Sequence, residues 1–239
     1  MFILMNEMSM QRNFEKIMNW ITHPVRTGRK NRERRRLLVN KNTEIVIEGF
    51  PRSANSFAVV AFQHAQTRKV SIAHHHHRVE QVIQGVEKNI PVCVLIRDPV
   101  DATKSAVLRD PGDVNDRLIR YIEFYRRAWP LRDRFVIATF SEVTSDYGKI
   151  IQKINKKFDT NYSLFEHNET NSAKVFDELS HLNSRFDNGN LERSSAPDRK
   201  RKEILNSMSV AMDQVLLEEA RVIFNQYLEV AEDPTIHHA

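Results

Sequence analysis

The chain has 239 residues, of which 41% are hydrophobic and 28% charged, and its formal net charge is +5. These are ordinary values for a soluble globular protein, and they exclude wholesale disorder and fibrous architectures. The single cysteine, Cys93, excludes an intramolecular disulfide framework and a metal site built from several thiolates.

The basic charge is concentrated at the start of the chain. Residues 1–43 carry ten Lys and Arg against three Asp and Glu, a net +7, which leaves −2 for residues 44–239. Apolar side chains at helical spacing predict a short amphipathic helix over 9–21, and residues 26–36 hold seven basic side chains. We therefore expect a basic amphipathic leader over 1–43. It is either a solvated arm or a patch that attracts polyanions or lipid headgroups.

Strand and helix signals alternate over residues 44–239. Apolar, β-branched runs predict four strands, at 43–49, 69–73, 91–96 and 134–139. Amphipathic stretches predict helices at 55–66, 79–89, 101–108, 114–129, 146–158 and 202–229. This order predicts an α/β domain with a mostly parallel central sheet, helices on both faces and a helical C-terminal extension.

The segment IVIEGFPRSANSF (45–57) carries the first binding signal. A buried strand ends at Gly49 and a helix begins near Asn55, so the turn between them lies at the carboxyl edge of the sheet, where α/β proteins bind ligands. A helix N-terminus attracts anions, and Arg52 adds a cation. The Walker A pattern GxxxxGK[ST] is absent. The alternative is an ordinary capped β–α turn.

A second signal follows the third strand, in LIRDPVDATKSAV (95–107). Arg97 lies at the same carboxyl edge, and Ser105 lies eight residues later on the next helix. An arginine and a hydroxyl placed in this way can converge on one phosphate, with the guanidinium as a bidentate donor. The alternative is that Arg97 pairs with Asp98 or Asp101.

Together the two segments resemble the sulfotransferases that use 3′-phosphoadenosine 5′-phosphosulfate (PAPS). GFPRSANSF is similar to that family's 5′-phosphosulfate loop, and RDPVDATKS is similar to its 3′-phosphate motif. A weaker similarity covers residues 136–158, where Phe140 takes the place of the usual Tyr. The resemblance covers roughly residues 43–160 and implies a P-loop NTPase-like fold. Ala54 stands where the family has Gly, so we expect a somewhat altered loop.

The resemblance implies a PAPS site and no metal. The residues expected to bind PAPS are Pro51, Arg52, Ser53, Ala54, Asn55, Ser56, Phe57, Arg97, Ser105 and Arg199. Phe57 is expected near the adenine. Arg199 belongs to a polar turn (192–202) that stands in place of the family's Gly-rich loop. The alternative for this turn is a helix N-terminus with a solvated basic first turn.

Four histidines follow the second strand, in AHHHHRVEQ (73–81). Sulfuryl transfer to a hydroxyl needs a base, and a histidine with a pKa near neutrality suits that role. The family commonly keeps its catalytic histidine just after this strand. In an extended chain His75 and His77 point to one side and His74 to the other, so His75 or His77 is the expected base and His74 a further candidate. A metal cluster and simple packing at the strand end are the alternatives.

The expected function is in-line transfer of a sulfuryl group from PAPS to an acceptor hydroxyl, with Arg52 offsetting charge at the phosphosulfate. A glycan is one acceptor class. The alternatives are a P-loop phosphotransferase or kinase, and a non-catalytic polyanion-binding module acting through residues 26–36. We expect no nucleic-acid partner. No signal or anchor is visible, so we expect a cytoplasmic protein whose residues 1–36 can contact a membrane surface.

Overall fold

The computed structural model describes residues 37–187 and 199–232. The amphipathic helix expected over 9–21 and the basic run 26–36 lie outside these residues. The chain divides into two compact units, residues 1–35 and 36–239. The start of the second unit is bonded to its α/β core, because the carbonyl of Leu37 accepts from the backbone N–H of His74 (3.1 Å).

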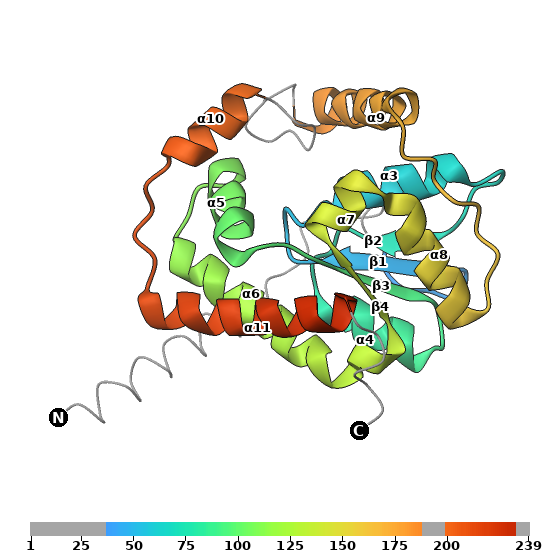
Figure 1. Cartoon of the computed structure of the whole chain (residues 1–239), viewed down its shortest axis with the longest axis horizontal. Helices are drawn as coiled ribbons and strands as arrows, with labels where there is room; N and C mark the ends of the chain where they lie inside the picture. The colour runs from blue at the N-terminus through green and yellow to red at the C-terminus, as the bar shows by residue number, and fades with distance from the viewer. Residues whose placement is uncertain (1–36, 188–198, 233–239) are drawn as a thin grey trace, which may run out of the picture. The chain divides into compact units, whose positions relative to one another are not determined.

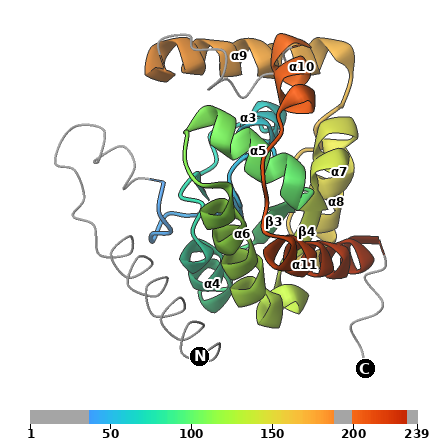
Figure 2. The ribbon, with the colours of Figure 1, turned by 90° about the vertical axis from the view of Figure 1, so that its left-hand side faces the viewer.

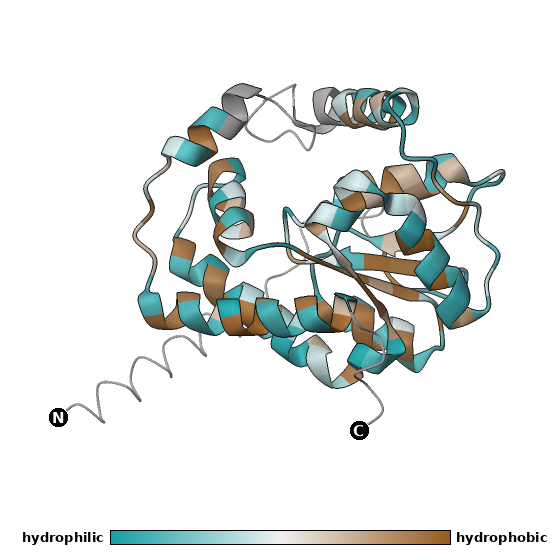
Figure 3. Cartoon of the chain, viewed as in Figure 1, coloured by the Kyte–Doolittle hydropathy of each residue, from teal (hydrophilic) through white to brown (hydrophobic). Residues whose placement is uncertain are grey.

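Four strands form one parallel sheet in the order β2–β1–β3–β4. They are β1 (Ile45–Gly49), β2 (Ile72–His74), β3 (Val92–Ile96) and β4 (Val136–Thr139). Every residue of β1 and β3 is buried, as continuous apolar runs predict for a sheet covered on both faces. Figure 3 shows these central strands mainly in the brown of hydrophobic residues.

Helices cover both faces of the sheet (Figure 1). One layer contains α3 (Asn55–Ala65), α7 (Phe140–Ser145), α8 (Tyr147–Phe158) and α9 (Glu169–Asp187). The other contains α4 (Val79–Glu87), α5 (Pro99–Arg109), α6 (Val114–Ala128) and α11 (Gln214–Glu232). A 3₁₀ turn (Trp129–Arg134) follows α6. In Figure 2 the helices α4 and α6 lie on one side of β3 and β4, and α7 and α8 on the other. The predicted fold class is confirmed.

Alternation along β1 divides the core between the two layers. Ile45 and Ile47 pack in the cluster under α3 and α8, whereas Val46 packs in the cluster under α4 and α6. Because β1 pairs with β2 on one side and β3 on the other, the direction of winding reverses between β1 and β3. Open α/β sheets bind ligands at the carboxyl ends of the strands beside such a reversal.

The C-terminal helices differ from the sequence prediction. The single helix expected over 202–229 is two helices, because α10 (Arg199–Ser207) ends before α11 begins. Asp213 caps α11, since its Oδ1 accepts from the backbone N–H groups of Val215 (2.9 Å) and Leu216 (3.1 Å). The helices α7 and α9 are additions to the prediction. No helix in the described ranges is long and apolar enough to cross a membrane.

Candidate functional site

A buried tyrosine of α6 forms hydrogen bonds with the loop that joins β1 to α3. The hydroxyl of Tyr125 donates to the carbonyl of Leu95 (2.7 Å) and accepts from the backbone N–H of Phe50 (3.3 Å). It also lies 3.5 Å from the hydroxyl of Ser53, which is fully buried. One buried phenol therefore connects the carboxyl ends of β1 and β3 to the loop. No sequence motif marked this residue.

Two residues of the loop adopt the left-handed conformation. Arg52 has φ 71° and Ala54 has φ 68°, a region that costs a residue with a Cβ about 1–2 kcal/mol. Ala54 is also the N-cap of α3, and no side chain caps the first turn of that helix. Glycine suits such a position best. Here alanine holds that conformation.

Asn55 is buried at the start of α3. Its Nδ2 donates to the carbonyl of Phe50 (3.0 Å), whereas no hydrogen-bond partner is found for its buried Oδ1 among the described residues. Pro51, Arg52, Ala54 and Ser56 are partly exposed. The loop therefore presents a partly open rim around a helix N-terminus that lacks a side-chain cap, an arrangement that suits an anion.

The two motifs predicted from the sequence meet in space. The Nε of Arg52 donates to the hydroxyl of Ser105 on α5 (2.9 Å), and the Nη1 of Arg97 donates to the carbonyl of Arg52 (3.2 Å). These bonds join the β1–α3 loop to the β3–α5 loop across the reversal point of the sheet.

The Arg97 side chain is largely buried. Its guanidinium lies 4.1 Å from the centre of the Phe140 ring, and its Nη2 lies 3.3 Å from Oδ2 of Asp101. Burial lowers the pKa of the guanidinium, and Asp101 opposes that shift. The alternative pairing with Asp101 is therefore present together with the contact to the loop. No hydrogen-bond partner is found for the buried Nε within the described part of the chain.

The histidines form a turn and not an extended segment. Strand β2 ends at His74, and His75 (φ 60°) and His77 (φ 53°) are both left-handed. The alternation of side chains expected for an extended chain is therefore wrong, because the chain bends at His75 and two left-handed residues interrupt the extended backbone. His74 and His75 instead contact each other through their Nδ1 atoms.

The turn packs against the β1–α3 region. The Nε2 of His75 lies 2.9 Å from the hydroxyl of Ser56, on the first turn of α3. The Nδ1 of His77 donates to the carbonyl of Gly49 (2.9 Å), so the neutral ring keeps Nε2 as its acceptor nitrogen. Two of the three candidate bases thus touch the expected PAPS loop.

Burial keeps these imidazoles neutral. Desolvation lowers the pKa of His74 and that of His77 to about 4, and it lowers the pKa of His75 well below its usual range. The positive charges of Arg52 and Arg109 lower the pKa of His77 further. The expectation of a pKa near neutrality is therefore wrong for these groups, because desolvation at the strand end disfavours the charged ring. A neutral imidazole is nevertheless the form that accepts a proton.

Glu48 is a buried group of this site that the sequence reading missed. It lies on β1, its exposed fraction is 0%, and desolvation raises its pKa to about 8. A single acid inside the run IVIEG is the sequence signal that marks it, because an acidic side chain is almost never fully buried without a partner.

All the expected PAPS contacts stay predictions, and Phe57 and Arg199 differ from the others in their surroundings. Phe57 is 5% exposed and packs against Phe165, His167 and Phe176, so little of its surface is open to an adenine. Arg199 begins α10, but its side chain and the turn 192–198 lie outside the described residues. No cluster of potential metal ligands is found in the described ranges.

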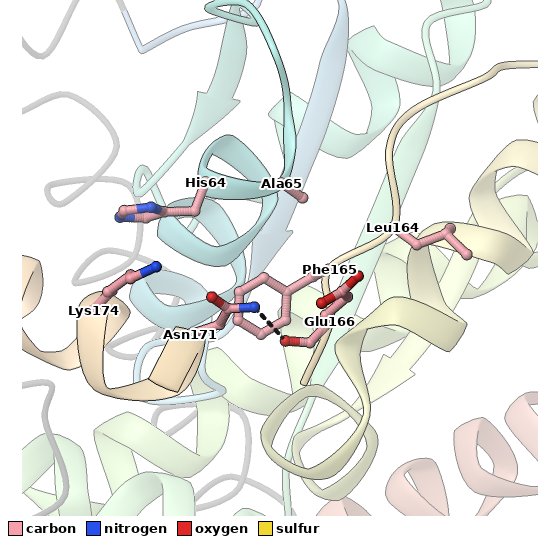
Figure 4. Close-up of a pocket in the computed structure, with 7 residues that line it drawn as sticks. All are labelled: His64, Ala65, Leu164, Phe165, Glu166, Asn171 and Lys174. Carbon is pink, nitrogen blue, oxygen red and sulfur yellow. Dashed lines mark hydrogen bonds between the residues drawn. The ribbon is translucent and has the colours of Figure 1, made fainter. Parts of the chain in front are cut away.

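A shallow pocket of about 200 Å³ lies at the other end of α3 (Figure 4). His64 and Ala65 line it from α3, Asn171 and Lys174 line it from α9, and residues 164–166 complete it. The Nδ2 of Asn171 donates to the carbonyl of Glu166 (3.0 Å). The loop residues 50–56 do not line this pocket, so it is separate from the site at the sheet edge.

Among solved structures, mouse sulfotransferase SULT7A1 complexed with PAP is similar to this chain, with a TM-score of 0.44 and 12% sequence identity. The match covers 82% of this chain and 87% of that one. No family model and no curated protein matches the sequence.

Proposed function

We propose that this chain transfers a sulfuryl group from PAPS to the hydroxyl group of an acceptor. The observation that carries the proposal is the junction of two loops at the carboxyl edge of the sheet, where Arg52 bonds to Ser105 and Arg97 bonds to the carbonyl of Arg52. The two sequence motifs that resemble the PAPS-binding motifs are the two segments that this junction joins.

The electrostatics of the junction support an anionic ligand. The Nε of Arg97 is buried without a partner among the described residues, and an unsatisfied buried donor costs about 1–3 kcal/mol. A phosphate oxygen would satisfy it. In the proposed assignment Arg97 and Ser105 hold the 3′-phosphate of PAPS, whereas Arg52 and the first turn of α3 hold the phosphosulfate.

The proposed chemistry uses a neutral histidine as base. The acceptor oxygen forms a bond to sulfur while the bond from sulfur to the bridging oxygen breaks, and the acceptor's proton passes to the histidine. Arg52 and the N–H groups of α3 stabilise the charge that develops on the bridging oxygen. We assign the base to His77, because its Nε2 is the acceptor nitrogen of a ring held through Nδ1, whereas the Nε2 of His75 is bonded to Ser56.

Calorimetry with 3′-phosphoadenosine 5′-phosphate (PAP) tests the site. The wild-type chain should bind PAP, and Arg52→Ala and Arg97→Ala should each weaken binding by about 10- to 100-fold, since a hydrogen bond to a charged group contributes about 1.5–3 kcal/mol. Arg68→Ala and Arg127→Ala are matched controls, because these arginines form exposed pairs with Glu44 and Glu80. Wild-type protein that binds no PAP, or site variants that bind as well as the controls, would contradict the proposal.

The same titration separates the rival functions. A phosphotransferase would bind ATP with Mg²⁺ more tightly than PAP, and a polyanion-binding module acting through residues 26–36 would bind a sulfated glycan but not PAP.

We propose a glycan as the acceptor class. Mass spectrometry of the products formed from a panel of glycans, lipids and phenols tests it. Contact of residues 1–36 with an anionic membrane surface is tested by co-sedimentation with anionic vesicles.

A further inference from the structure

Glu48 lies directly beneath the histidine turn. It is the single acidic residue in the strands that the structure describes. Alternation along β1 places it on the same side of the sheet as Val46, in the layer covered by α4 and α6. A fully buried carboxyl group is rare in an apolar layer and needs partners there.

Its partners are the backbone of the turn. Oε1 accepts from the backbone N–H of His76 (2.7 Å), and Oε2 accepts from that of His77 (3.1 Å). Oε2 also lies 3.8 Å from the Nδ1 of His77. One carboxyl group thus contacts two consecutive amides and approaches the ring of the second residue.

The turn needs such a support. Its left-handed residues, His75 and His77, each lie in a region that costs about 1–3 kcal/mol and persists only when the surroundings over-determine it. An apolar side chain in place of Glu48 would remove the acceptors of two partly buried N–H groups, at up to about 1–3 kcal/mol each. The Glu48 carboxyl group therefore selects this backbone over an extended one.

We propose that Glu48 is the positioning residue of the histidine base: its two oxygens hold the backbone of the turn, so that the ring of His77 keeps its proton on Nδ1, against Gly49, and keeps Nε2 free to accept. The inference rests on the proposed function for the role of His77, but the geometry that Glu48 imposes can be measured without substrate. When Nε2 takes a proton, the resulting imidazolium lies beside the carboxyl group, which stabilises it if ionised.

Several other ionisable groups surround this pair. His74 and His76 flank it in the turn, and Arg52 and Arg109 act on the ring from the β1–α3 loop and the end of α5. The phenols of Tyr121 and Tyr125 face this layer from α6, with hydroxyls that donate to backbone carbonyls. Burial raises the pKa of both phenols, so neither changes charge between pH 5 and 9.

Glu48→Gln is the informative variant. It keeps the size of the side chain but offers one acceptor oxygen and one NH₂ group, so one of the two backbone N–H groups must lose its partner. Glu44→Gln is the matched control, because Glu44 lies just before β1 and accepts from the backbone N–H of Ser71 (2.9 Å). The control should leave the histidine turn unchanged.

Nitrogen-15 NMR of histidine-labelled full-length protein reads the geometry directly. In the wild type we expect His77 to carry its proton on Nδ1 from pH 5 to 9, with an inflection near pH 8 as Glu48 ionises. In Glu48→Gln we expect mixed tautomers, no inflection, and amide hydrogen exchange at His76 or His77 at least tenfold faster. In Glu44→Gln these signals should match the wild type.

The outcomes separate this inference from the proposed function. Two results would overturn the inference. The first is a wild-type His77 that carries its proton on Nε2, a result that can be read even if Glu48→Gln does not fold. The second is a folded Glu48→Gln variant in which the His77 tautomer and the amide exchange rates match those of the wild type. PAP calorimetry is run on the same samples: Glu48→Gln should bind PAP within twofold of the wild type, because Arg52 and Arg97 are untouched. A wild-type protein that does not bind PAP contradicts the proposed function but leaves the geometry assigned to Glu48 intact.

Discussion

Glu48 is fully buried and the three histidines His74, His75 and His77 lie partly buried beside it, and desolvation displaces the pKa values of the acid and of the imidazoles in opposite directions. The pKa of Glu48 is raised to about 8, and those of His74 and His77 are lowered to about 4. Both shifts have the same cause, since burial disfavours whichever form is charged. The site is thus assembled mainly from neutral forms near pH 6, with the arginines as its fixed charges.

These shifts predict a maximum in the free energy of unfolding near pH 6.5. As pH rises from about 4 to 6.5, the unfolded chain still binds protons that the folded histidines have released, so stability rises. From its ordinary value of 4.5 up to about 8, the folded chain keeps a proton on Glu48 that the unfolded chain has lost, so this group lowers stability throughout that range. The histidines outweigh it below pH 6.5, whereas above 6.5 they no longer offset it. The free energy of unfolding falls by at most about 2 kcal/mol between pH 6.5 and 8, because one displaced proton changes it by about 1.36 kcal/mol per pH unit. Urea unfolding from pH 5 to 9 measures it.

Glu48→Gln supplies the control for this pH profile. The variant should show a steeper rise below pH 6.5, because the opposing contribution of Glu48 is gone there, and it should lose the fall above pH 6.5, because only Glu48 among these groups titrates in that range. A wild-type profile that is flat between pH 6.5 and 8 would contradict the displaced pKa of Glu48.

At the scale of single residues, the sequence indicated Arg52, Arg97 and Ser105, because each lies at a fixed offset from a strand end. It could not indicate the left-handed turn, which depends on Glu48 beneath it.

At the scale of elements, the close approach of β1 and β3 depends on Gly49. A Cβ at this position would lie 2.3 Å from the carbonyl oxygen of Leu95, a rigid group of the neighbouring strand, so the strands must separate. We expect Gly49→Ala to lower the free energy of unfolding by more than about 2 kcal/mol and to weaken PAP binding, since the loop begins there. Gly112→Ala, where the nearest atom is 3.7 Å away, should change stability by less than about 0.5 kcal/mol. Equal effects of the two substitutions in urea unfolding would refute this account.

The strands were predictable because their apolar runs are long and both faces of the sheet are covered. The predicted 91–96 and the observed Val92–Ile96 differ by one residue. The division of the predicted helix 202–229 was not predictable from periodicity, because apolar side chains continue through residues 208–212 and the break is set by the Asp213 cap. The helix α9 was missed because its apolar contacts, through Val175 and Leu179, are few among polar residues.

At the scale of the whole molecule, the end of the basic leader and the boundary between the two compact units lie close together in the sequence. The leader carries a net +7 over residues 1–43, while the compact units divide at residue 35. The difference is the segment 36–43, which belongs to the second unit. There Val39 donates from its backbone N–H to Oε1 of Gln81 (2.8 Å), and Leu37 accepts from His74. The second of these bonds reaches the start of the histidine turn.

Two truncations test this boundary and locate the nucleotide site. Removal of residues 1–35 should leave both PAP affinity and the free energy of unfolding unchanged, because the proposed site lies wholly in the second unit. Removal of residues 1–43 should lower the free energy of unfolding by about 2 kcal/mol, since each of the two lost hydrogen bonds contributes about 1 kcal/mol. It should also loosen the turn at His74 and with it the presentation of His77. Urea unfolding and PAP calorimetry on the two proteins measure both effects. Loss of PAP binding on removal of residues 1–35 would contradict the assignment of the PAP site to the second unit.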